Sequence, residues 1–206
     1  MLKRCFDLAL SLPLLLLSLP FLIAIAILIR LDSPGPALFI QDRLGFKGAP
    51  FRMYKFRTMR DKSEKVGTGL NSFEDDPRVT RIGKYLRLFS LDELPQLGNV
   101  ILGEMSIVGP RPPVSYELGR YEDFSPRQRL RFAVKPGITG LAQVSGRNML
   151  DWNQKIEIDN HYVSLRHRYG VLIDIKILFQ TVQVVLSARN VIEGNSGQNS
   201  NTTSAT

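Results

Sequence analysis

The stretch SLDELPQLGNVILGEMSIVGPRP, residues 90–112, decides how this chain folds around a site. It holds two adjacent carboxylates, Asp92 and Glu93, among leucines, and it ends with Arg111 between two prolines. Carboxylates in apolar surroundings are costly unless cations or a ligand compensate their charge. The acidic pair therefore predicts a functional site, provided that the rest of the chain supplies the compensating charges.

Two interpretations of the acidic pair compete. Ser90 and Glu93 have the spacing of a capping box, so the pair could simply begin a helix. Pro95 argues against a regular first turn, because it has no amide hydrogen for the Leu91 carbonyl. Neighbouring helical residues point about 100° apart, so Asp92 and Glu93 cannot face each other as acid and base. That geometry suits a nucleophile beside a supporting carboxylate, as in aspartyl-phosphate enzymes.

Pro110, Arg111 and Pro112 fit a second need of phosphoryl transfer, a cation that offsets charge on the transferred group. The flanking prolines restrict the arginine backbone to extended conformations, so its guanidinium is presented with little entropy left to lose. The alternative is a rigid surface turn. A carboxylate nucleophile must also be ionised, which nearby arginines favour, and such chemistry usually requires Mg²⁺.

The composition limits the partners of the chain. Its 206 residues favour one domain with an appendage. Lys and Arg number 27 against 19 Asp and Glu, and the net charge of +8 favours anionic partners: phosphorylated substrates, an anionic membrane or nucleic acid. Cys5 is the single cysteine, which excludes an intrachain disulfide. We expect His161 and His167, the two histidines, to be ordinary surface or packing residues.

The first thirty residues, MLKRCFDLALSLPLLLLSLPFLIAIAILIR, predict membrane association. The apolar run 8–29 can cross a bilayer, which takes roughly 20 residues, and it exceeds the apolar region of a signal peptide. A transmembrane anchor and a helix that returns to its side of entry both fit. Pro13 and Pro20 kink a helix and favour the return. The cations that can bind lipid headgroups at the two ends are Lys3, Arg4 and Arg30.

The remaining segments predict a mixed, mostly helical domain. Alternating apolar and basic residues predict a strand over 51–60, and cations at every third position predict a helix over 78–90. Residues 61–77 are typical of a mobile loop, and they are our candidate for an active-site lid. Further along we expect a helical segment within 114–135, a glycine-punctuated loop over 136–148 whose amides and Arg147 could meet a phosphate, a helix over 152–170, an apolar helix from 171 and a disordered tail over 193–206.

Four segments together resemble a known family. They are DPRVTRIGKYLRLFSLDELPQLGNVILGEMSIVGPRP at 76–112, MYKFRTM at 53–59, KPGITGLAQVSGRN at 135–148 and IDIKILFQT at 173–181. These segments closely resemble the signature of the bacterial sugar transferases, in particular the small monotopic polyprenyl-phosphate phosphoglycosyl transferases. With the amino-terminal apolar run, the resemblance covers most of residues 3–185.

The resemblance implies a fold and an activity. The fold is α+β and mostly helical, with a re-entrant membrane helix over 1–31 and a compact catalytic domain with interfacial amphipathic helices over 32–192. The activity is transfer of sugar-1-phosphate from a UDP-sugar to polyprenyl phosphate, with release of UMP and a covalent aspartyl intermediate. Such a reaction is the first membrane step of glycoconjugate synthesis, at the cytoplasmic face of the bacterial inner membrane.

The resemblance also assigns roles to residues. Asp92 is the nucleophile and lies close to Mg²⁺, Glu93 is the supporting carboxylate, and Arg111 between Pro110 and Pro112 contacts nucleotide or phosphate. The helix break of the family falls on Pro20, although its usual serine partner is displaced here to Ser18. Further expected substrate contacts are Lys55, Arg57, Arg87 and Arg147.

Two other functions remain as alternatives: a membrane-anchored basic binding module, and an assembly subunit that keeps the fold without catalysis. Neither explains an acidic pair beside an arginine held by prolines. We expect the partners to be a UDP-sugar, with a lean toward an N-acetylated amino sugar, polyprenyl phosphate and anionic lipid. We expect no nucleic acid, and self-association into a homo-oligomer stays open.

Overall fold

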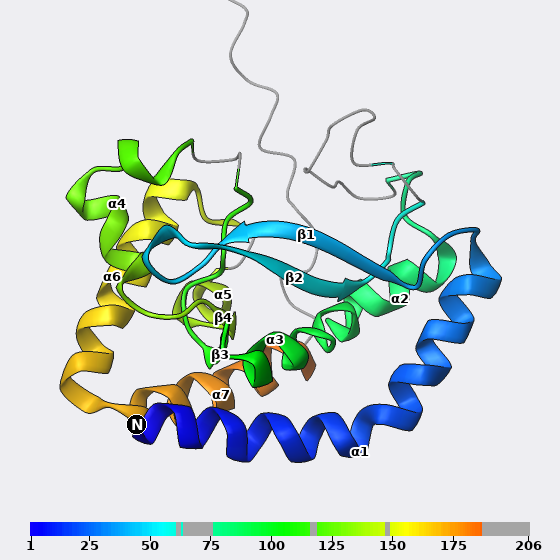
Figure 1. Cartoon of the computed structure of the whole chain (residues 1–206), viewed down its shortest axis with the longest axis horizontal. Coiled ribbons are helices and arrows are strands. Elements are labelled where there is room, and N and C mark those ends of the chain that lie inside the picture. The colour runs from blue at the N-terminus through cyan, green and yellow to red at the C-terminus, as the bar shows by residue number, and fades with distance from the viewer. Residues whose placement is uncertain (61–62, 64–75, 116–118, 147–148, 187–206) are drawn as a thin grey trace, which may run out of the picture.

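The computed structural model describes residues 1–60, 63, 76–115, 119–146 and 149–186. In this part the chain is a mostly helical α+β protein (Figure 1). Its longer elements are α1 (Leu2–Asp32), β1 (Leu38–Leu44), β2 (Pro50–Phe56), α2 (Arg81–Leu88), α3 (Gln96–Leu102), α6 (Trp152–Tyr169) and α7 (Val171–Leu186). The shorter ones are the 3₁₀ turns η1 (Phe46–Gly48), η3 (Leu91–Glu93), η4 (Tyr121–Asp123) and η5 (Arg131–Ala133), the strands β3 (Ser106–Val108) and β4 (Gly137–Thr139), and the helices α4 (Pro126–Leu130) and α5 (Leu141–Ser145).

Helix α1 is long and apolar, and it curves around one side of the rest of the chain (Figure 1). By length and composition it could cross a membrane, and it is the one such helix in the described part of the chain. A straight helix of 31 residues would reach about 46 Å, which would carry its two ends far apart. Instead both ends pack on the same domain. Pro13 and Pro20 lie inside the helix, where they weaken its hydrogen bonding and permit curvature, and Ser18 Oγ donates to the Leu15 carbonyl.

A buried ionic network holds the amino-terminal end of α1. Lys3 Nζ lies 3.0 Å from carboxylate oxygens of both Asp7 and Asp174. Asp7 accepts a hydrogen bond from Ser106 Oγ on β3, and Asp174 on α7 accepts one from the Tyr162 hydroxyl on α6. Asp7, Ser106, Tyr162 and Asp174 are all buried. The network therefore joins α1 to three elements of the catalytic domain.

Two of the three cations predicted to bind lipid headgroups, Lys3 and Arg4, contact the protein, whereas Arg30 is exposed. The Lys3 side chain is only 13% exposed in its network. Arg4 donates to the carbonyls of Val100 and Ile101 at the end of α3, at 2.5 and 2.7 Å. A lipid phosphate at either residue would have to displace these contacts.

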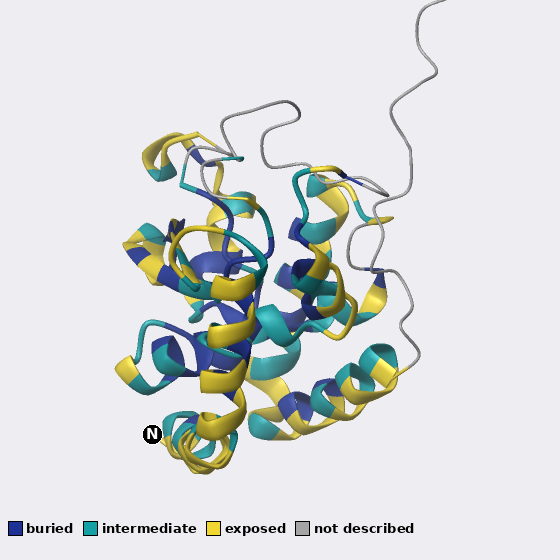
Figure 2. Ribbon diagram, turned by 90° about the vertical axis from the view of Figure 1, so that its right-hand side faces the viewer, coloured by how far each residue is buried: buried dark blue, intermediate teal, exposed yellow. Residues whose placement is uncertain are grey.

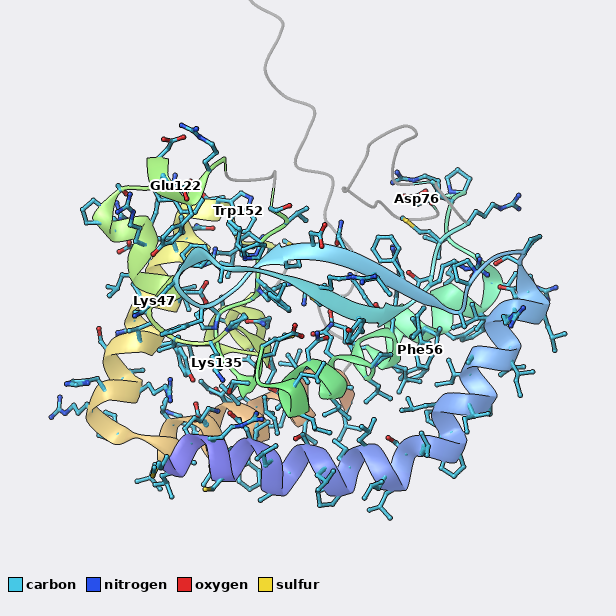
Figure 3. All side chains as sticks on the ribbon, viewed as in Figure 1. Lys47, Phe56, Asp76, Glu122, Lys135 and Trp152 are labelled. Atoms are coloured by element: carbon cyan, nitrogen blue, oxygen red, sulfur yellow. The ribbon has the colours of Figure 1, made fainter. Side chains whose placement is uncertain are left out.

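The carboxyl-terminal half of α1 packs on β2 and α2. Leu22, Ile25 and Ile29 are buried against Phe56 of β2 and Leu86 of α2. Figure 3 labels Phe56 where it lies between the strand and the helix. This contact and the ionic network together fix both ends of α1 on one body.

The sheets are small. β1 and β2 form an antiparallel hairpin with Leu38 opposite Phe56 and Leu44 opposite Pro50, so the strand predicted over 51–60 is confirmed but ends at Phe56. β3 and β4 pair in parallel, with Ser106 opposite Gly137. Helices α6 and α7 pack against this second pair, and the shared core includes buried residues of β2, α3, β3, α6 and α7.

The segment 136–148 is not the loop that its glycines predict. It contains strand β4 and helix α5. A Cβ atom at Gly137 would lie 2.1 Å from the Gly109 amide nitrogen, and one at Gly140 would lie 2.1 Å from the Gly109 carbonyl oxygen. These glycines therefore serve close backbone packing rather than chain flexibility.

The outer surfaces of α1 and α7 are apolar, and the two helices lie along the same side of the molecule (Figures 1 and 2). On α7, Leu172, Phe179 and Leu186 are 70–81% exposed. On α1, most leucines of the central stretch are exposed. Exposed apolar surface of this extent on two neighbouring helices is typical of contact with a membrane.

Candidate active site

The acidic pair lies in a tight connection between α2 and α3. Ser90 ends the preceding segment in the left-handed region with φ 54°, and Asp92 and Glu93 follow in the 3₁₀ turn η3. The Ser90 side chain does not cap the turn, so the capping-box interpretation is wrong. The irregular first turn predicted from Pro95 is confirmed, since α3 begins only at Gln96.

Glu93 and Arg111 form an ion pair. Glu93 Oε1 lies 2.8 Å from Arg111 Nη1, and the Glu93 side chain is 12% exposed. The Arg111 side chain keeps 43% of its surface exposed, so its guanidinium can still meet a ligand. The ion pair thus compensates the charge of Glu93 in apolar surroundings, and it orients the guanidinium of Arg111.

Asp92 is the carboxylate left available for chemistry. It makes no hydrogen bond or ion pair within the described residues. Burial is the main cause that raises the pKa of Asp92 to about 6, and the charge of Glu93 raises it further. The positive charges of Lys55, Arg87 and Arg111 pull this pKa down, so all three lie within electrostatic reach of Asp92.

Two of these cations come from the hairpin side of the site. Lys55 is on β2, and burial, followed by the charges of Arg43 and Arg111, lowers its pKa to about 8. Arg87 on α2 donates from Nε to Thr58 Oγ1 at 2.9 Å. Helix α2 can approach this closely because Gly83 packs on the Thr58 backbone, where a Cβ would lie 2.0 Å from the carbonyl oxygen.

The backbone that carries Arg111 is held at every carbonyl. Prolines at three of the four positions 110–113 leave few amide donors, so the segment depends on donors from elsewhere. Each carbonyl from 110 to 113 accepts one. In carbonyl order the donors are the Gly137 amide at 3.0 Å, Arg131 Nη2 at 2.8 Å, Arg43 Nη1 at 2.9 Å and the Leu44 amide at 3.1 Å.

Arg131 is itself fixed by a buried ion pair. Its Nη2 lies 2.7 Å from Asp159 Oδ2 on α6, and the two side chains are 2% and 1% exposed. The guanidinium also lies over the Trp152 ring, 5.4 Å from its centroid. Burial raises the pKa of Asp159 to about 6, although Arg131 opposes this shift. Arg131 is therefore a positioning residue for Arg111, and no motif in the sequence pointed to it.

An apolar groove of about 280 Å³ begins beside the ion pair. Glu93 and Arg111 are the charged residues that line it. Asp92, Lys55 and Arg87 do not line it, so the groove reaches the site at the Glu93–Arg111 ion pair. The other lining residues are Leu14 of α1, Phe89, Ser90, Leu91, Leu94, Leu97, Ile107, Ile138, Thr139, Gln143, Val144, and Leu178, Thr181, Val184 and Val185 of α7.

The structure brings most of the predicted site residues together. Lys55, Arg87 and Arg111, the last flanked by Pro110 and Pro112, surround the acidic pair as expected.

One other predicted contact, Arg57, has partners elsewhere, and the position of another, Arg147, is not described. Arg57 is 4% exposed and donates to the Ser33 and Pro34 carbonyls at the end of α1, so the structure places it as a helix-end contact, away from the acidic pair. Arg147, most of the candidate lid over 61–77 and the tail from 193 lie outside the described residues.

The site fits a Mg²⁺ ion bound together with a phosphorylated substrate. Within the described part of the chain no three His, Cys, Asp or Glu residues cluster as a metal cage. Mg²⁺ commonly takes only one or two carboxylates and completes its shell with water and substrate phosphates. Asp92 can supply such a ligand, because no described residue bonds to it, whereas Glu93 is engaged by Arg111.

Comparison with known proteins identifies the family. The family described as bacterial sugar transferase matches residues 1–188, nearly the whole described structure. The chain therefore belongs to the bacterial sugar transferase family.

Three curated relatives show the range of the family. An uncharacterized sugar transferase of Bacillus subtilis is 41% identical over 94% of this chain and 92% of its own length. A UDP-glucose:undecaprenyl-phosphate glucose-1-phosphate transferase of Escherichia coli is 44% identical over 88% of this chain and 39% of its own length. A UDP-N-acetylgalactosamine-undecaprenyl-phosphate N-acetylgalactosaminephosphotransferase of Aeromonas hydrophila is 38% identical over 90% of this chain and 44% of its own length. The chain thus spans less than half of the latter two relatives.

We predict that Arg131 acts on Arg111 and not only on stability. Arg131→Met alone leaves Asp159 buried and unpaired, which should cost about 3–5 kcal/mol of unfolding free energy. The double variant Arg131→Met/Asp159→Leu should recover most of that stability, because the buried charge is gone. It should still turn over at least about tenfold more slowly, since one carbonyl bond to the arginine segment is lost. Thermal unfolding and turnover of the detergent-solubilised variants check this. A stable double variant with normal turnover would contradict the positioning role.

Proposed function

We propose that the chain is a phosphoglycosyl transferase that moves sugar-1-phosphate from a UDP-sugar to polyprenyl phosphate and releases UMP. The observation that carries this proposal is Asp92: a half-buried carboxylate with no hydrogen-bond or ion-pair partner among the described residues, under the influence of three cations and next to Glu93, which lines an apolar groove. The cations suit a diphosphate and the groove suits a lipid. The relatives named as undecaprenyl-phosphate transferases support the same reaction.

In the first half-reaction an Asp92 oxygen attacks the β-phosphorus of the UDP-sugar. The bond from that phosphorus to the bridging oxygen breaks, and UMP leaves with the oxygen and its electron pair. The enzyme then carries the sugar phosphate as a mixed anhydride on Asp92. Lys55, Arg87 and Arg111 offset the charge that develops on the phosphoryl and leaving-group oxygens.

In the second half-reaction an oxygen of polyprenyl phosphate attacks the same phosphorus. The bond between phosphorus and the Asp92 oxygen breaks, which regenerates the carboxylate and releases polyprenyl diphosphate sugar. Bound Mg²⁺ would supply further neutralisation of phosphate charge at Asp92. Glu93 keeps Arg111 oriented in both half-reactions through their ion pair.

We also propose that α1 enters the membrane and returns on the cytoplasmic side. Both of its ends contact the catalytic domain, and its exposed surface between them is apolar. Lys3, Asp7 and Asp174 would be costly to separate across a bilayer, because each would lose its partner in or beside hydrocarbon.

Cys5, the exposed single cysteine, reports this topology. We expect a membrane-impermeant maleimide to label it in inside-out vesicles and to leave it unlabelled in intact spheroplasts. A Cys5→Ala variant with a cysteine at exposed Ser164 of α6 marks the side of the catalytic domain. Labelling of Cys5 from the side opposite to Ser164→Cys would show that α1 spans the membrane.

Asp92→Asn should lower UMP release by at least roughly 10³-fold, because the amide is a poor nucleophile. The assay mixes purified protein with Mg²⁺, polyprenyl phosphate and a panel of UDP-sugars that includes N-acetylated amino sugars. Membrane association should be unchanged in the variant, which separates an enzyme from a basic binding module. Substantial turnover by Asp92→Asn would rule out the nucleophile, and no release by the unmodified protein with any sugar would favour an inactive assembly subunit.

The first half-reaction should depend on pH through Asp92 and Lys55. Asp92 attacks only when ionised, so with its pKa raised to about 6 the burst of UMP should fall as pH drops below 6. Lys55, with its pKa lowered to about 8, loses its charge above that pH, which gives a second decline. In Lys55→Met the acid limb should move to higher pH, because a charge that lowers the Asp92 pKa is removed. Single-turnover rates from pH 4 to 9 check this. An acid limb near pH 4 in the unmodified protein, or one that stays in place in Lys55→Met, would contradict the prediction.

A further inference from the structure

Gln143 on α5 carries a side-chain amide that the protein leaves unsatisfied. It lines the apolar groove, and both its Nε2 and Oε1 atoms are buried without a hydrogen-bond partner in the described structure. Buried polar groups nearly always have partners, so an unpartnered amide in a groove indicates a ligand that completes it. The two atoms together require an acceptor and a donor.

The walls of the groove indicate an apolar ligand. Leu14 of α1 and Leu178 and Val185 of α7 form part of its lining. Leu14 is 48% exposed, and next to Val185 in the chain Leu186 is 81% exposed. The groove therefore continues onto the apolar surfaces of α1 and α7, from which a lipid chain could enter without crossing water.

The charges place the reactive end of such a lipid. Arg111 lines the groove and remains partly exposed, so a phosphate there would meet this cation, which also acts on the charge of the neighbouring Asp92. Lys55 and Arg87 also act on Asp92 but do not line the groove, which leaves these two cations for the nucleotide.

We propose that this groove holds the first isoprene units of the acceptor and that the Gln143 amide binds the acceptor phosphate. This inference rests on the proposed transferase function. A singly protonated phosphate monoester matches both amide atoms, because its oxygens accept from Nε2 and its hydroxyl donates to Oε1. That proton is released to water when a phosphate oxygen attacks the intermediate. The phosphodiester of an ordinary membrane lipid has no such hydroxyl. Gln143 therefore selects the polyprenyl monophosphate from the surrounding phospholipid and orients it toward the intermediate on Asp92.

The test compares the two half-reactions in Gln143→Leu and Gln143→Glu. Gln143→Leu removes both hydrogen bonds at similar size, and we expect the KM for polyprenyl phosphate to rise about tenfold. Gln143→Glu adds negative charge beside a phosphate, and a larger rise is expected. The UMP burst without acceptor and the KM for the UDP-sugar should stay unchanged. Gln183→Leu is the matched control, since Gln183 is exposed on α7 and does not line the groove.

A second variant tests the groove itself. Val185→Trp fills its α7 wall and should also raise the acceptor KM about tenfold while sparing the burst. A UMP burst of normal size shows that a variant is folded. If Gln143→Leu loses the burst, the acceptor KM of Val185→Trp tests whether the groove binds the acceptor.

Three outcomes would overturn the inference. A slower burst or a raised KM for the UDP-sugar in Gln143→Leu, with an unchanged acceptor KM, would mean that Gln143 contacts the sugar. Unchanged constants in both Gln143→Leu and Val185→Trp would mean that the groove binds neither substrate. Competition by a phosphodiester lipid as strong as by a phosphomonoester lipid would exclude selection of the monoester. Failure of the proposed function is separate, because the unmodified protein would then give no burst.

Discussion

The fixed backbone of residues 110–113 is the constraint on which the site depends. Three prolines leave this segment with a single backbone amide donor. Its shape is therefore set by donors from the β1–β2 hairpin, from η5 and from β4, which bind its carbonyls. Arg111 is consequently held at two places, at its backbone by these donors and at its guanidinium by Glu93. A cation held in this way can neutralise phosphate charge without reorganisation during the reaction.

The same arrangement gives the site two unlike sides. Toward the hairpin, Lys55 and Arg87 approach Asp92, while toward α1 and α7 the surface is apolar and continues to the outside of the molecule. A water-soluble nucleotide sugar and a membrane lipid could thus reach one carboxylate from different media. The curved α1 contributes exposed apolar surface along this side of the molecule, and its Leu14 lines the groove.

The sequence predicted those features that depend on local chemistry. The alternation over 51–60, the irregular turn forced by Pro95 and the acidic pair beside Arg111 were all evident from residue types and spacing. Long-range partners were not. Arg131 lies outside the segments that carry the family resemblance, and although Gln143 lies within one of them, nothing local shows that Arg131 reaches a carbonyl of the arginine segment or that Gln143 lines a groove. Arg57 misled for the same reason, because its carbonyl partners at the end of α1 are distant in sequence.

The ion pair between Lys3 and Asp174 has a consequence for the order of assembly. Its two residues are separated in sequence by almost the whole catalytic domain, so Arg4 and Asp7 can meet their partners near residues 100–106 before the second carboxylate of Lys3 has been made. The apolar helix can meet the bilayer early, yet its amino-terminal end has all its contacts only after α7 has been synthesised and packed. Insertion and folding are thereby coupled: the helix that first reaches the membrane is among the last elements to acquire its complete set of contacts.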